Sequence, residues 1–228
     1  RFSMDGTTRG PMAFLKKLRG KPNENNKSGA TAGAQQMKML RRLPKLLRFI
    51  PGTAQDVRAY FLTLQYWLAG SEENIAGMVQ MLLDHFADSP RKSLRGKVKI
   101  APPIDYPEVG LYHPQMKGAE VYKGMADTIS ALPPAATAGK KGTVGLLLMR
   151  SYLLAGNAKH YDGVLAALEA RGLAVLPAYA TGLDARPAVE QFFMKDGRAQ
   201  IDAVISLTGF SLVGGPAYND SKAAEEML

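Results

Sequence analysis

The sequence has 228 residues, of which 46% are hydrophobic, enough for a packed core in one large domain or two small ones. It has no cysteine, which excludes disulfides and thiolate metal sites, and no uninterrupted apolar stretch of about 18 residues, which argues against a membrane-spanning helix. The formal charge of +9 is concentrated in residues 1–50, which contain 12 Lys and Arg against 2 Asp and Glu.

Residues 1–95 are predicted to form an α-helical region with a basic N-terminal segment. A short amphipathic helix at 12–19 precedes a flexible loop at 21–36, which consists mainly of Asn, Gly, Ala, Ser, Thr and Lys. A basic amphipathic helix then covers 37–50, and Pro44 is expected to kink or break it. Such a basic face can bind a membrane or nucleic acid, but it is more often the solvated side of a soluble helix, and we predict no nucleic-acid partner.

Two longer helices follow in the same region. The first is predicted between Thr53, a good N-cap residue, and Gly70, a residue typical of helix C-termini. The second is predicted between Ser71 and Pro90, and the short loop between the two helices indicates an antiparallel hairpin. Trp67 belongs to an apolar stripe and is expected to pack in the core rather than to contact a pigment.

Residues 96–141 are predicted to be a proline-rich connector that contains one helix. Six of the fourteen prolines lie in this region. Residues 102–113 should be extended, a helix is expected at 116–132, and a linker of small residues and lysines covers 137–142.

Residues 142–228 alternate between apolar runs and helical patterns. The apolar runs are residues 143–149, 173–177 and 201–208, and the helical patterns are residues 159–171 and 184–194. This order predicts an α/β fold with a Rossmann- or flavodoxin-like βαβαβ unit, whose strands are parallel and covered on both faces. A further helical pattern at 221–228 has no stop signal, so we expect a domain that is incomplete at its C-terminus, in a fragment of a larger multidomain protein.

The carboxyl ends of three parallel strands deliver three loops to one edge of the sheet, at residues 150–158, 178–183 and 209–216. Ligands bind at this edge in open sheets of this kind. The substrate-binding candidates are therefore Arg150, Ser151, His160, Thr208, Gly209, Phe210, Gly214 and Gly215.

Each candidate has a functional and a structural interpretation. Arg150 could hold a ligand carboxylate through its planar fork, or form a surface salt bridge. The glycines could let the backbone approach a ligand closely, or make a tight turn at the end of the strand. His160 could contact a ligand or shuttle a proton, whereas His85 and His113 are expected to be surface or hydrogen-bonded histidines. No spacing of these histidines predicts a metal site.

Four segments carry a resemblance to a known family: Leu43–Lys45, Gln65–Asn74, Arg150–Tyr152 and Ser206–Pro216. In sequence and in order they are similar to segments of the porphyrin-binding large (H) subunit of magnesium chelatase, and the related cobaltochelatase large subunit shares its general plan. The last segment is long and specific. The resemblance identifies the chain as an internal fragment of such a subunit.

The resemblance implies a function that composition does not show. The family's large subunit binds protoporphyrin IX, into which Mg²⁺ is inserted for chlorophyll or bacteriochlorophyll biosynthesis in photosynthesis. An AAA+ ATPase subunit and a companion subunit drive the reaction with ATP, in the cytoplasm or in the plastid stroma of a plant or alga. The family's acidic and histidine catalytic residues belong to a motif further along, so no catalytic residue is assigned and the fragment alone is expected to be inactive.

Two other interpretations remain open. The region could be a docking module for the ATPase partner subunits that contacts no pigment, with the basic residues 1–50 as the docking face. It could instead be an unrelated doubly wound nucleotide-binding enzyme. The absence of a Gly-x-Gly-x-x-Gly fingerprint and of a phosphate-binding loop argues against the second interpretation.

Overall fold

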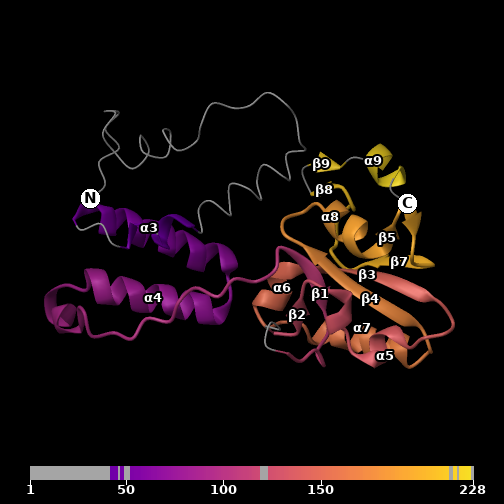
Figure 1. The fold of residues 1–228 in the computed structure, drawn as a ribbon, viewed down its shortest axis with the longest axis horizontal. Coiled ribbons are helices and arrows are strands. Elements are labelled where there is room, and N and C mark those ends of the chain that lie inside the picture. Colours follow the sequence, from indigo (N-terminus) through magenta and orange to yellow (C-terminus); the bar gives the residue numbers. More distant parts are fainter. Residues whose placement is uncertain are drawn as a thin grey trace. The chain divides into compact units, whose positions relative to one another are not determined.

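The computed structural model describes residues 42–45, 47–48, 52–118, 123–215, 218–219 and 221–226. The segments predicted at 12–19 and 21–36, and most of the helix predicted at 37–50, lie outside these residues. The chain divides into two compact units, residues 1–68 with 76–103 and residues 69–75 with 104–228 (Figure 1). The predicted division placed boundaries after residues 95 and 141 instead.

The first unit contains most of two helices, α3 (Thr53–Ala69) and α4 (Glu72–Phe86), which lie where the sequence predicts them. Tyr66 of α3 packs against Met81 of α4, and its hydroxyl donates a hydrogen bond to the Ala101 carbonyl at 2.5 Å. A short 3-10 helix, η1 (Ser89–Leu94), follows α4. Gly70 has a φ of 62°, which ends α3 and turns the chain toward α4.

Trp67 lies on the surface of the first unit, so the prediction that it packs in the core is wrong. Its side chain is 63% exposed, because α3 packs on α4 through Tyr66 instead. The two helices expose further large apolar side chains, namely Tyr60, Leu68, Val79, Leu82 and Phe86. Together with Trp67 these residues are called the exposed apolar face of α3 and α4.

The second unit is organised around a five-stranded sheet with the order β2-β1-β4-β3-β7. The strands are β1 (Val109–Tyr112), β2 (Met125–Ala126), β3 (Thr143–Met149), β4 (Ala174–Ala180) and β7 (Ala203–Ser206). β3 pairs in parallel with both β4 and β7, which confirms the three predicted parallel strands. β1 pairs antiparallel with β4 and with β2, so the sheet as a whole is mixed.

β1 and β2 come from the segment that was predicted to be a connector. The helix predicted at 116–132 is wrong in the described part of that range, which holds β2 and the 3-10 turn η2 (Ile129–Ala131). Gly118, Lys123 and Gly124 have φ values of 149°, 52° and 72°, which a right-handed helix does not allow. A short helix, α5 (Pro134–Thr137), follows.

Helices connect the parallel strands as predicted, with two differences. The β3–β4 connection contains α7 (Lys159–Glu169) and also α6 (Arg150–Leu154), in a segment predicted to be a loop. The β4–β7 connection contains α8 (Arg186–Ala188), which continues as a π-helical turn, η3 (Val189–Phe193). The remaining elements are the hairpins β5 (Met194–Lys195)–β6 (Arg198–Ala199) and β8 (Gly214–Gly215)–β9 (Tyr218–Asn219), and α9 (Ser221–Glu225). Among the described residues, no helix has the length and apolar character that a membrane span requires.

The sheet buries one core on each face. Leu146 and Leu148 of β3 pack with Tyr161 and Leu165 of α7, whereas Leu147 packs on the side of α8 and η3. This alternation follows from the period of two along a strand. Figure 1 shows α7 and α8 on opposite sides of β3 and β4. A side chain near the end of a strand therefore belongs to either the α7 face or the α8 face of the sheet.

Candidate functional site

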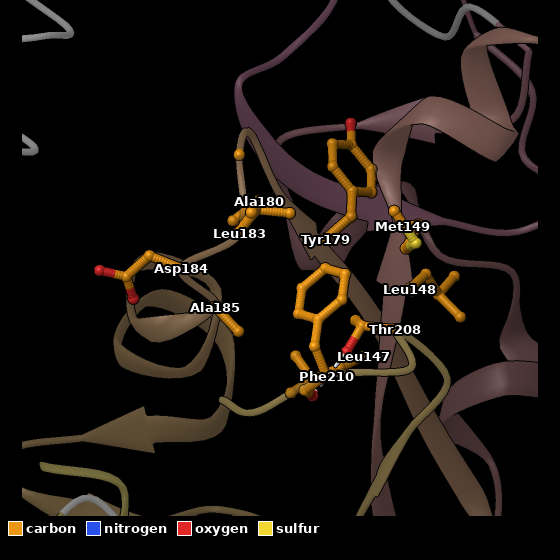
Figure 2. Close-up of a pocket in the computed structure, with 11 residues that line it drawn as sticks. Leu147, Leu148, Met149, Tyr179, Ala180, Leu183, Asp184, Ala185, Thr208 and Phe210 are labelled. Carbon is orange, nitrogen blue, oxygen red and sulfur yellow. Dashed lines mark hydrogen bonds between the residues drawn. The ribbon is translucent and has the colours of Figure 1, made fainter. Parts of the chain in front are cut away.

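A pocket lies at the carboxyl ends of β3 and β4, at the edge where the sequence predicts a ligand (Figure 2). It is a shallow depression, because only about 20 Å³ of it can be occupied by a water-sized sphere. Its lining residues are Leu147, Leu148, Met149, Tyr179, Ala180, Gly182, Leu183, Asp184, Ala185, Thr208 and Phe210. The lining is mainly apolar, with the Thr208 hydroxyl and the Asp184 side chain as polar groups.

Two of the three predicted loops meet at this pocket. The loop after β4 and the loop after β7 are joined by a main-chain hydrogen bond of 3.0 Å from Ala185 N–H to the Leu212 carbonyl. The Thr208 hydroxyl bonds the Phe210 carbonyl at 3.1 Å and lies 2.9 Å from the Ser206 hydroxyl. These bonds shape the loop after β7, and two of the predicted candidates, Thr208 and Phe210, line the pocket.

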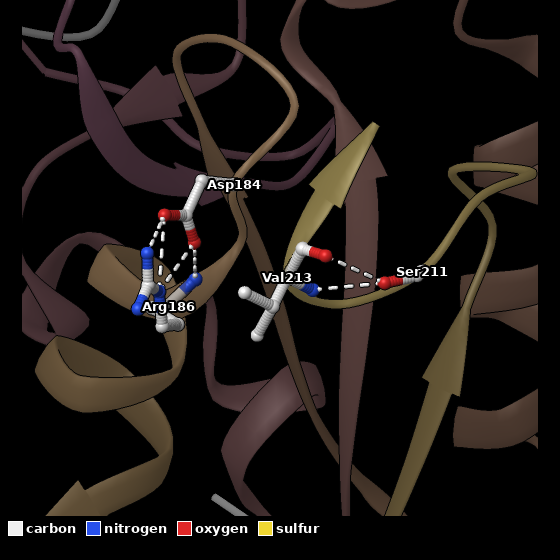
Figure 3. A network of polar contacts seen from close by, with 4 residues as sticks. All are labelled: Asp184, Arg186, Ser211 and Val213. Atoms are coloured by element: carbon white, nitrogen blue, oxygen red, sulfur yellow. Dashed lines mark hydrogen bonds and ion pairs between the residues drawn. The ribbon is translucent and has the colours of Figure 1, made fainter. Parts of the chain in front are cut away.

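Asp184 and Arg186 form an ion pair at the rim of the pocket (Figure 3). Arg186 Nη2 lies 2.6 Å from Asp184 Oδ2, and Arg186 Nε lies 3.0 Å from each carboxylate oxygen. Asp184 Oδ1 also accepts the Arg186 main-chain N–H at 3.0 Å, an Asx turn just before α8, which begins at Arg186 rather than at the predicted residue 184. The hydrogen bonds from Arg186 hold the pKa of Asp184 below its usual value.

A second polar motif closes the loop after β7. The Ser211 hydroxyl donates to the Val213 carbonyl at 2.8 Å and accepts the Val213 N–H at 3.2 Å (Figure 3). Val213 is buried. The loop therefore has its own internal hydrogen bonds and does not depend on a ligand for its shape.

Arg150 and Ser151 do not line this pocket. Arg150 Nε donates to the Pro107 carbonyl at 2.8 Å, and its Nη2 donates to the Tyr106 carbonyl at 3.2 Å. Tyr106 belongs to the core on the α7 face, so these main-chain carbonyls hold the guanidinium on that face of the sheet. Ser151 is an exposed residue of α6. The structure thus separates these two candidates from Thr208 and Phe210.

The histidines are also distributed away from the pocket. His160 is an exposed residue of α7, with its ring 5.3 Å from the ring of Tyr152. His113 is buried, and its Nε2 lies 2.9 Å from Glu169 Oε1 while its Nδ1 accepts the Gln115 N–H at 3.1 Å, which confirms a hydrogen-bonded core histidine. Within the described part of the chain, no three His, Asp or Glu side chains are placed to hold a metal ion.

The glycine candidates differ from one another. Gly209 has a φ of 78° and no atom within 4 Å of the position that a Cβ would take. This geometry supports the tight-turn interpretation, since the left-handed conformation favours glycine. Gly214 and Gly215 form β8, which pairs with β9.

Sequence reasoning missed most of the pocket's lining. Leu183, Asp184 and Ala185 follow β4 and were not predicted, although the strand order already placed their loop at this edge. Asp184 stands at the start of the helix predicted at 184–194, and an aspartate there is an N-terminal signal that could have drawn attention to it. Tyr179 was missed because β4 runs three residues beyond the predicted end at Pro177.

Comparison with known proteins gives the chain's family. Residues 64–228 match the family described as CobN/Magnesium Chelatase, and residues 1–61 match one described as Domain of unknown function (DUF3479). The magnesium-chelatase H subunit of Rhodobacter capsulatus is 53% identical over 219 residues, which are 96% of this chain and 17% of that protein. The magnesium-chelatase H subunit of Cereibacter sphaeroides is 50% identical over 100% of this chain and 18% of its own length.

A plant relative shows the same partial coverage. The chloroplastic ChlH protein of Oryza sativa subsp. indica, also named as a magnesium-chelatase subunit, is 33% identical over 98% of this chain and 16% of its own length. The chain therefore spans less than a fifth of the curated relatives that it matches. The family match over residues 64–228 covers well over half of the sequence, and the chain belongs to the CobN/magnesium chelatase family.

Proposed function

We propose that this chain is part of the porphyrin-binding subunit of a magnesium chelatase, the enzyme that inserts Mg²⁺ into protoporphyrin IX in chlorophyll or bacteriochlorophyll biosynthesis. The observation that carries the proposal is the 53% identity to a magnesium-chelatase large subunit over nearly the whole chain. In this proposal an AAA+ ATPase subunit and its companion supply ATP hydrolysis. The complex works in the cytoplasm, or in the plastid stroma if the source is a plant or alga.

The pocket at the carboxyl ends of β3 and β4 is proposed as one wall of the porphyrin site. Its apolar lining suits the face or edge of a macrocycle, and its few polar groups lie at the rim. The space that a water-sized sphere can occupy here is only about 20 Å³, far below the roughly 300–1,000 Å³ of pockets that bury a drug-sized ligand. The pocket is therefore proposed only as a shallow surface that the macrocycle covers, and other parts of the subunit would complete the site.

The chemistry of insertion assigns no catalytic role to the described residues. Mg²⁺ must lose water ligands that it releases reluctantly, and two pyrrole protons must pass to a base. The Thr208 hydroxyl is a poor base, and the Asp184 carboxylate is engaged by Arg186. The role of this edge is to bind and orient the macrocycle, and the isolated chain is expected to be inactive.

The test uses the complete subunit and a substitution that fills the pocket. Ala185→Phe places a ring in the space that Ala185 lines, whereas Ala166→Phe places the same ring on the exposed side of α7. Protoporphyrin affinity is measured by quenching of intrinsic fluorescence. We expect Ala185→Phe to weaken binding at least tenfold and Ala166→Phe to leave it unchanged. Equal affinities of the two variants would rule out this edge as a wall of the site.

A second function is favoured by the exposed apolar face of α3 and α4. Six large apolar side chains of α3 and α4 are exposed, and exposed apolar patches often mark a protein interaction site. Docking of the ATPase partners would use this face, whereas the basic segment at residues 1–50 lies mainly outside the described residues. Val79→Ser with Phe86→Ser in the complete subunit should then weaken partner binding without changing porphyrin affinity. Unchanged partner binding would contradict this second function.

A further inference from the structure

Two arginines directly follow lining residues of the pocket, and the structure places them differently. Arg150 follows Met149, and its guanidinium bonds main-chain carbonyls on the α7 face. Arg186 follows Ala185 and is the first residue of α8, and it is paired with the lining residue Asp184. Its side chain is 45% exposed, so a ligand larger than the pocket can reach it.

Arg186 already holds a carboxylate in the geometry that it would offer a ligand. Both oxygens of Asp184 face its Nε and Nη2 atoms at 2.6–3.0 Å, which is the bidentate arrangement of a guanidinium with a carboxylate. In Figure 2 the Asp184 carboxylate points away from the labelled apolar residues of the pocket. The ion pair therefore lies at the outer rim, beyond the apolar floor.

The Asp184–Arg186 pair is also easy to exchange. Asp184 is only two residues from Arg186, and both side chains are partly exposed, at 31% and 45%. Ion pairs with this degree of exposure typically contribute little free energy because water solvates both partners. An incoming carboxylate can replace Asp184 on Arg186 at small cost, while Asp184 regains water.

We propose that Arg186 anchors a peripheral carboxylate of the ligand, and that Asp184 holds the guanidinium in place until the ligand carboxylate replaces it. This inference rests on the proposed function, which supplies a ligand with an apolar ring and propionate arms. The ring would cover the apolar lining of the pocket, and one propionate would extend over the rim to Arg186. Arg150, the anchor predicted from the sequence, is replaced in this role.

The test compares two ligands that differ only in charge. Protoporphyrin IX and its dimethyl ester are titrated into the complete subunit in the same detergent, and fluorescence quenching gives both affinities. Arg186→Ala should weaken the free acid at least tenfold and the ester less than twofold. Arg186→Lys keeps the positive charge but loses the two parallel donors of the guanidinium. Its affinity for the free acid should therefore lie between those of Arg186→Ala and the unmodified subunit. Arg198→Ala, an exposed arginine on β6, is the matched control and should change neither affinity.

Asp184→Asn gives a result of opposite sign. It removes the competing charge while an amide oxygen can still accept the Arg186 N–H, so the free acid should bind about two- to fivefold more tightly and the ester should be unaffected. Equal effects of Arg186→Ala on both ligands, or no effect on either, would overturn the anchor. If Ala185→Phe also changes neither affinity, the proposed porphyrin wall fails. If Ala185→Phe weakens both ligands, only the role of Arg186 fails.

Discussion

Removal of the phenolic oxygen should change the free energy of unfolding in opposite directions at two buried tyrosines of the sheet, Tyr112 and Tyr179. The Tyr112 hydroxyl donates a 2.7 Å hydrogen bond to Asp162 of α7. The Tyr179 hydroxyl makes no hydrogen bond with the described residues and is fully buried above Gly110. Burial raises the pKa of both phenols, so each remains protonated at neutral pH. Replacement by Phe deletes one oxygen at each position.

The magnitudes follow from what each oxygen contacts. A hydrogen bond to a charged acceptor contributes about 1.5–3 kcal/mol. Asp162 is partly exposed, so in Tyr112→Phe a water molecule can bond its carboxylate and offset part of this loss. We expect Tyr112→Phe to lower the free energy of unfolding by about 1–2 kcal/mol. Burying a hydroxyl without a partner costs about 1–3 kcal/mol, and this cost disappears when the hydroxyl is removed. The void that one oxygen leaves costs less than about 1 kcal/mol, so most of the gain remains. Tyr179→Phe should therefore raise the free energy of unfolding by about 1 kcal/mol.

Urea denaturation of the chain measures both changes. Trp67 is the single tryptophan and reports the first unit, so circular dichroism is used to follow the second unit. The free energy of unfolding falls with urea concentration by about 2 kcal/mol per molar, so a change of about 1 kcal/mol shifts the unfolding midpoint by about 0.5 M urea. The midpoint should fall for Tyr112→Phe and rise for Tyr179→Phe. A fall of equal size for both variants would refute the reasoning, because it would show that the Tyr179 hydroxyl has a favourable partner.

Three further substitutions test the packing and charges of the second unit. Gly163→Ala in α7 should stabilise the chain by about 0.5–1 kcal/mol, since no atom lies within 4 Å of the new Cβ and alanine is the better helix former; a lower urea midpoint would contradict this. Gly145→Ala in β3 should instead destabilise it by about 1–3 kcal/mol, since its Cβ would lie 2.7 Å from the buried Phe193 ring; an unchanged midpoint would show that the ring can move. Asp184→Asn should cost about 0.5 kcal/mol at neutral pH, since the ion pair with Arg186 is partly exposed. Because Arg186 lowers the pKa of Asp184, this contribution is present above the ordinary pKa of 3.8 and should disappear as the pH falls below it; a difference in midpoint from the unmodified chain that stays constant between pH 7 and pH 3 would contradict the assignment.

The parallel part of the sheet could be predicted because its strands leave a strong pattern. Residues 143–149 are almost all apolar, and the structure buries both faces of this strand between α7 and α8. β1 and β2 left no such pattern. β1 has four residues and β2 has two, and both lie in a proline-rich segment where short strands resemble an extended linker. β1 takes its place in the sheet by pairing with β4, which is a tertiary contact, and β2 takes its place by pairing with β1.

The edge of the sheet that carries the pocket could be predicted from topology, but the side chains that line the pocket there could not. All three loops follow parallel strands, so their position at one edge follows from strand direction alone. Successive side chains of a strand point to opposite faces, so residues two apart lie on the same face. Arg150 is two residues from Leu148, which lies on the α7 face. A strand that is apolar on both faces gives no signal for which of its end residues remain uncovered. That information comes from the loop after β4, where the hydrogen bond from Ala185 to Leu212 holds the pocket wall in place and sets Arg186 at its rim.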